Sequence, residues 1–98
     1  MTHARIPDRA DYARAALEAF ERQVGRGDRY TLILDLITDL GHLASKHRIE
    51  FLGLISQAIG IWAYERMHPD GDGEMPRVTI SIDGYRPKHA RRRKERAA

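Results

Sequence analysis

Cysteine is absent from all 98 residues of the chain. This absence excludes disulfide bonds, thiolate metal sites and cysteine nucleophiles. Because disulfides persist mainly in exported proteins, the absence fits a reducing compartment, and we expect a cytoplasmic protein. The polar stretch from Met1 to Arg9 also has no apolar segment of the kind found in secretory signals.

Long apolar runs are missing as well. The most apolar stretch, Phe51 to Tyr64, has 14 residues and contains Ser56 and Gln57. A helix needs about 20 apolar residues to cross a bilayer, so we expect no contact with membranes.

The length of the chain limits its core. A chain of 98 residues allows one domain with a modest core, and such a domain can gain further buried surface by associating with a second copy.

Catalytic motifs are absent from the sequence. It contains no His-Glu-x-x-His motif, no phosphate-binding glycine loop and no serine in a nucleophile elbow. Gly71-Asp72-Gly73 matches only a fragment of a calcium loop and predicts a turn. We therefore expect no catalytic residues and no cofactor.

Charge is distributed unevenly along the chain. Residues 86–98 hold seven basic residues and one acidic residue, a net charge of +6, whereas residues 1–85 hold ten basic and thirteen acidic residues, a net charge of −3. Such a division predicts a tail that binds anions. The basic residues of the tail are Arg86, Lys88, Arg91, Arg92, Arg93, Lys94 and Arg96.

These tail residues are the strongest functional signal in the sequence. Clustered guanidinium and ammonium groups displace counterions from phosphates, so nucleic acid or another polyanion is the expected partner. An acidic protein surface, or no specific role, are the alternatives. Tyr85, which precedes the tail, is a candidate for stacking on a base or an incidental aromatic residue.

Apolar spacings of three and four residues predict three helices, at about 8–24, 29–47 and 50–67. Asp28 is the expected N-cap of the second helix, Gly25 ends the first, and Pro69 stops the third. We expect an all-α domain over residues 1–76, with the second and third helices as an antiparallel hairpin and the first helix across it.

The third predicted helix is apolar on more than one face and contains two interior glycines. Gly53 and Gly60 lie seven residues apart, nearly on one side of the helix, and each costs about 1 kcal/mol relative to alanine. Close approach of another helix would offset that cost. We therefore predict that Gly53, Gly60 and Trp62 lie in an interface, and that the chain forms a homodimer.

A short β segment is expected after the helices. Val78, Ile80 and Ile82 alternate with Thr79 and Ser81, which is the period of a half-buried strand. The sequence offers no second strand to pair with it, so residues 77–85 form either a strand that pairs with another copy or another protein, or an extended arm. Residues 86–98 follow as a flexible basic tail.

Acidic residues on the helices are the only candidates for a metal site. Asp35, Asp39 and His42 share one helix face at spacings of four and seven residues, and Glu18 and Glu21 lie three residues apart. The alternative interpretation is a solvated helix face with ordinary surface charges. We favour that interpretation and expect no bound metal.

The stretch Asp35-Leu-Ile-Thr-Asp-Leu-Gly-His-Leu-Ala-Ser-Lys-His-Arg-Ile-Glu-Phe51 resembles two groups of proteins. The first is a loose group of short, uncharacterised bacterial and prophage proteins. They share a leucine-rich Asp-Leu helix with a His, a short turn, and an acid and Phe that open another helix. This resemblance covers roughly residues 10–67 and implies no particular activity.

The same stretch is similar to the second half of the MazG-type all-α nucleoside triphosphate pyrophosphohydrolases. That resemblance rests on Asp35 and on Ile49-Glu50-Phe51. It implies magnesium held by a paired-glutamate motif, for part of which Glu18 and Glu21 would stand, and by an acid-x-x-Asp motif. Leu32 occupies the first acid position of that motif.

Taken together, these patterns predict a small non-enzymatic binding or accessory protein, of phage or plasmid type, that engages nucleic acid or a nucleic-acid-bound complex through its tail. Two alternatives stay open. One is a divergent magnesium-dependent nucleotide pyrophosphohydrolase, and the other is an inhibitor or accessory subunit of a larger host protein.

Overall fold

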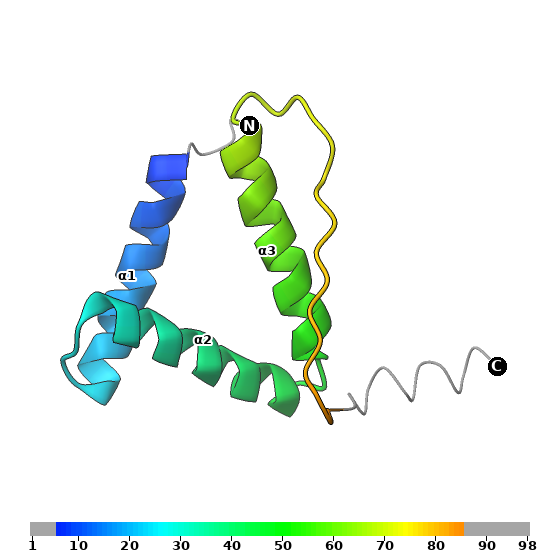
Figure 1. Cartoon of the computed structure of the whole chain (residues 1–98). Coiled ribbons are helices and arrows are strands. Elements are labelled where there is room, and N and C mark those ends of the chain that lie inside the picture. Colours follow the sequence, from blue (N-terminus) through cyan, green and yellow to red (C-terminus); the bar gives the residue numbers. More distant parts are fainter. Residues whose placement is uncertain (1–5, 86–98) are drawn as a thin grey trace. The chain divides into compact units, whose positions relative to one another are not determined.

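The computed structural model describes residues 6–85, which form three helices: α1 at Ile6–Val24, α2 at Arg29–Lys46 and α3 at Phe51–Met67 (Figure 1). The expected all-α class is confirmed for this part of the chain. The chain divides into two compact units between His42 and Leu43, within α2. The expected antiparallel packing of α2 and α3 stays a prediction. Within residues 6–85, no helix is both long and apolar enough to cross a membrane.

The first unit contains α1 and most of α2. Its most buried apolar side chains are Leu17, which is 7% exposed, and Leu32, which is 4% exposed. In the sequence, Leu17 of α1 recurs at helical spacing with Ala13 and Phe20. The helix ends at Gly25, whose φ of 102° is a conformation that favours glycine and whose N–H donates to the Glu21 carbonyl at 2.8 Å. The predicted end of the first helix is therefore confirmed.

Asp28 caps the N-terminus of α2, as the sequence predicts. One carboxylate oxygen accepts the Thr31 N–H at 3.0 Å, and the other accepts the Thr31 hydroxyl at 2.8 Å. These hydrogen bonds favour the ionised carboxylate, so the backbone N–H of Thr31 and then its hydroxyl lower the pKa of Asp28. The cap satisfies a backbone donor that would otherwise lack a partner within the helix.

A left-handed residue terminates α2. Arg48 has a φ of 60°, and its N–H donates to the Ser45 carbonyl at 3.1 Å, while the Ile49 N–H donates to the Ala44 carbonyl at 2.8 Å. This pair of hydrogen bonds is the Schellman arrangement, in which glycine is the usual residue at the left-handed position. Arginine occupies that position here, and the steric crowding of its Cβ makes the left-handed conformation less favourable than it would be for glycine.

Glu50 caps the next helix, α3. Its carboxylate accepts the N–H groups of Leu52 at 3.1 Å and Gly53 at 2.8 Å. At the other end, the His68 N–H donates to the Tyr64 carbonyl at 2.8 Å, and Pro69 follows directly. The predicted stop before Pro69 is confirmed, because proline disfavours a helical residue ahead of it.

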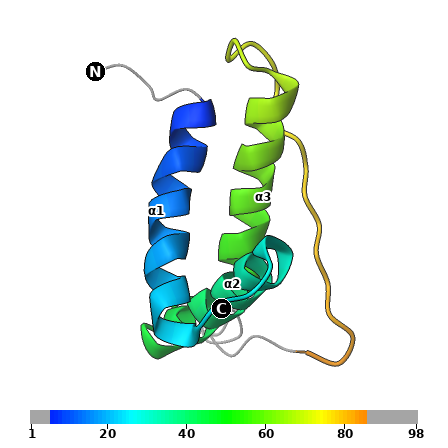
Figure 2. The same cartoon turned by 90° about the vertical axis from the view of Figure 1, so that its left-hand side faces the viewer.

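An extended arm, defined here as residues 75–83, follows α3 and runs alongside it in both views (Figures 1 and 2). Pro76, Val78 and Ile80 are half-buried, whereas Arg77 and Thr79 are exposed. The predicted alternation is therefore present, but no β-strand forms within residues 6–85. A strand requires a hydrogen-bonded neighbour, and this part of the chain supplies none, so the arm packs on α3 through one face.

Candidate functional site

The arm lies within van der Waals contact of α3 at Gly60, which is buried. A Cβ on Gly60 would lie 3.4 Å from Val78 Cγ2, 3.9 Å from the Pro76 carbonyl oxygen and 4.0 Å from Met75 Sδ. The glycine therefore lets an extended chain lie directly on the helix backbone. Close approach at Gly60 was expected, but the neighbour is the arm rather than a second helix.

The other two predicted interface residues have different surroundings. A Cβ on Gly53 would lie 3.2 Å from Oε1 of Glu50, so the small residue leaves room for the N-cap. Trp62 is 61% exposed, and the Arg66 guanidinium lies 6.0 Å from its ring centroid, within range of a cation–π contact. An interface between copies at these residues stays a prediction.

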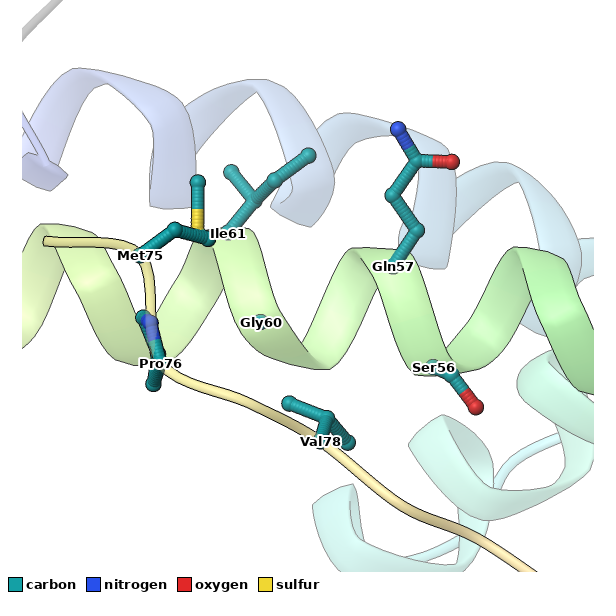
Figure 3. A pocket seen from close by; sticks show the side chains of 7 residues that line it. All are labelled: Ser56, Gln57, Gly60, Ile61, Met75, Pro76 and Val78. Carbon is teal, nitrogen blue, oxygen red and sulfur yellow. The ribbon is translucent and has the colours of Figure 1, made fainter.

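An open groove of about 380 Å³ lies between α3 and the arm (Figure 3). Figure 3 shows Val78 on the arm beside Gly60, and Ile61 and Met75 together on one side of that glycine. The groove is lined by Ser56, Gln57, Gly60 and Ile61 from α3 and by Met75, Pro76 and Val78 from the arm.

The chemistry of this groove suits apolar side chains. No acidic or basic residue lines it, and the Ser56 hydroxyl donates its proton to the Leu52 carbonyl at 2.8 Å. The lining therefore offers aliphatic surface together with the amide of Gln57. Of these residues, the sequence marked Gly60 for close packing and Val78 for burial. It gives no sign of which helix residues the returning chain meets.

The candidate metal ligands lie on the surface of α1 and α2. Asp35, Asp39, His42 and Glu18 are exposed, and Glu21 is half-buried. Among the residues that the structure describes, no three His, Asp or Glu side chains come close enough to hold a metal ion. Leu32, at the acid position of the MazG-type motif, is 4% exposed and belongs to the apolar core of its unit.

The seven basic tail residues, from Arg86 to Arg96, lie outside the described residues. The last described residue is Tyr85, which is 51% exposed and whose N–H donates to the Ile82 carbonyl at 3.1 Å. This bond closes a turn in which Gly84 has a φ of 79°, which confirms the Asp83-Gly84 turn signal. The turn ends the arm directly before the basic segment.

Apolar side chains remain exposed along α2. Ile33, Ile37 and Leu40, which recur at helical spacing, are 47%, 40% and 47% exposed. We call these three residues the α2 stripe.

Comparisons with protein-family models, with curated proteins and with solved structures found no match to this chain.

Proposed function

We propose that this chain is a small, non-enzymatic accessory protein that binds nucleic acid through the basic residues of its C-terminal segment and acts as a homodimer. The observation that carries the proposal is the separation of charge. Residues 86–98 have a net charge of +6, and residues 1–85 have a net charge of −3. A polyanion is attracted to the first segment and repelled by the second.

The chemistry of recognition follows from the residue types. Arg91, Arg92 and Arg93 carry planar guanidinium groups, which pair with phosphate through two hydrogen bonds. Phosphate contacts position a protein on nucleic acid without reading its sequence. We therefore expect binding with little base preference and a strong dependence on salt.

The homodimer is supported by the number of large apolar side chains at the surface. The α2 stripe is about half exposed, and on α3 Ile61 and Trp62 are 43% and 61% exposed. Large apolar side chains exposed in groups favour an interaction surface. Two copies would bring two basic segments to one nucleic acid, which raises affinity without new contacts.

The experiment that tests the proposal compares two charge-matched variants of the full chain. One carries Arg91, Arg92 and Arg93→Gln, and the other carries Arg26, Arg29 and Lys46→Gln at exposed positions of the helical part. Each loses three positive charges. Fluorescence anisotropy with a DNA duplex and a single-stranded RNA should show weakened binding only for the first variant, and equal affinities would overturn the proposal.

A further inference from the structure

The arm presents two charged residues at its two ends, and neither has an ion-pair partner among residues 6–85. Arg77 and Asp83 are both exposed. They are six residues apart, which is about 20 Å in an extended chain, so they cannot pair with each other. Between them, Val78, Ile80 and Ile82 alternate with Thr79 and Ser81.

This segment is symmetric about Ile80. Residues equally far from Ile80 on its two sides are of the same or complementary kind. Ser81 and Thr79 both carry hydroxyl groups, and Ile82 and Val78 are both β-branched. Asp83 and Arg77 have opposite charges. In an antiparallel pair of identical segments, the residue opposite each position is the one equally far from the centre on the other side. Opposite charges and β-branched residues in such positions stabilise the pair.

We propose that two copies of the chain pair their arms as antiparallel β-strands, with Ile80 opposite Ile80 of the second copy. This register places Arg77 opposite Asp83 of the second copy at both ends of the ribbon. A shift of two residues in either direction puts Arg77 opposite Ser81 or Tyr85 and loses both charge pairs. The inference rests on the homodimer of the proposed function, because it names the surface through which the copies meet.

The backbone of the arm is available for this pairing. Within residues 6–85, its only backbone hydrogen bond runs from the Tyr85 N–H to the Ile82 carbonyl, at the turn. In an extended chain, backbone donors and acceptors point sideways, perpendicular to the side chains, so packing through one face leaves them at the edges. Pro76, which has no N–H, and the turn at Gly84 limit the ladder to about residues 77–83.

The surroundings of the arm also favour a second strand. An isolated two-stranded ribbon is marginally stable, but packing against a helix supports it. The arm already packs on α3 at Gly60 through Val78 and Met75, and Pro76 and Ile80 are half-buried. Ile82, on the same face, is 53% exposed and would lie opposite Val78 of the second copy. The groove beside Ile61 offers additional aliphatic surface to the incoming chain.

Charge reversal in the full chain tests the proposal. Arg77→Asp or Asp83→Arg places like charges opposite each other at both ends of the ribbon, so each variant should dimerise at least about fivefold more weakly than the wild type. A mixture of the two variants forms heterodimers in which both pairs are again opposite in charge. The mixture, and the double variant Arg77→Asp with Asp83→Arg, should dimerise like the wild type in sedimentation equilibrium, where the monomer mass is 11.2 kDa.

A second measurement fixes the register. Because the natural chain has no cysteine, Arg77→Cys and Asp83→Cys introduce single thiols without background. Oxidation of a mixture of these two variants should yield a covalent heterodimer, because the opposed residues come within disulfide range. Either variant alone should stay uncrosslinked, since its two thiols would be about 20 Å apart.

Two results would overturn the inference. They are a wild-type chain that stays monomeric at all concentrations, and a dimer that neither charge reversal weakens. In the second case, disruption by Ile37→Asp would assign the dimer interface to the α2 stripe instead. Circular dichroism on each variant verifies that the helices are folded. Fluorescence anisotropy with the same DNA duplex separates arm pairing from nucleic-acid binding. If chains that stay monomeric still bind the duplex, arm pairing is refuted, whereas binding through the basic segment is not.

Discussion

Val78 of the arm lies against Gly60 of α3, so closely that a Cβ on Gly60 would be 3.4 Å from Val78 Cγ2. That distance is ordinary van der Waals contact, which a methyl group tolerates. A larger side chain would have to occupy the space that the arm fills. Gly60 therefore sets how close the arm can lie to the helix.

We expect a graded response at Gly60. Gly60→Ala should keep the arm in place and stabilise α3 by up to about 1 kcal/mol, because alanine is the better helix former. Gly60→Leu should displace the arm and expose the Arg77–Val78 bond. Mass spectrometry after brief trypsin treatment should then detect a fragment ending at Arg77 earlier than in the wild type. Ala58→Leu, at an exposed position of α3, is the control and should not change that rate.

Replacing Arg48 by glycine should stabilise the protein. The φ of 60° at Arg48 costs a residue with a Cβ roughly 1 kcal/mol, which glycine avoids. Glycine has more conformational entropy in the unfolded chain, which opposes folding. The expected net stabilisation is therefore about 0.5 kcal/mol. Lys46→Gly, inside the last turn of α2, should instead destabilise by about 1 kcal/mol. Thermal unfolding measures both, and a destabilised Arg48→Gly variant would contradict this explanation of the turn.

The Asp28 cap should contribute to stability in a pH-dependent way. Hydrogen bonds from Thr31 lower the pKa of Asp28 in the folded state, so the folded protein favours the ionised carboxylate. The contribution is fully present above the unfolded pKa near 3.9 and is lost as the pH falls through the lower folded pKa. Asp28→Asn keeps the capping oxygen but cannot titrate, so its melting temperature should fall less steeply below about pH 4. Parallel acid-unfolding curves for the two proteins would contradict the linkage.

The acidic face of α2 should not bind divalent metal tightly. Asp35, Asp39 and His42 are exposed, and no third ligand joins any two of them within residues 6–85. Calorimetry with magnesium or manganese should therefore detect no micromolar site. Micromolar binding that Asp39→Ala abolishes, together with hydrolysis of a nucleoside triphosphate to the monophosphate, would instead favour the pyrophosphohydrolase alternative.

The helix ends could be predicted from the sequence because their determinants are local. Asp28 and Thr31 are three residues apart, and Gly25 and Pro69 act on the backbone beside them. The left-handed Arg48 was not predicted, since the usual signal at that position is glycine.

The environment of the arm could be predicted only in part. Alternation at Val78 and Ile80 indicated an extended, half-buried chain, and it was correct about the burial. Whether such a segment becomes a strand depends on a hydrogen-bonded neighbour, which the alternation does not specify. For the same reason Gly60 signalled a close contact but not that the arm would supply it.

The dependence of nucleic-acid affinity on salt tests the central claim most directly. If the basic segment neutralises about four phosphates, the logarithm of affinity should fall against the logarithm of salt concentration with a slope of roughly −3 to −4. In the variant with Arg91, Arg92 and Arg93→Gln, the slope should become shallower by about one for each arginine that contacts a phosphate, whereas the variant with Arg26, Arg29 and Lys46→Gln should keep the wild-type slope. Equal slopes for the two variants, or no binding by the wild type even at low salt, would contradict the account.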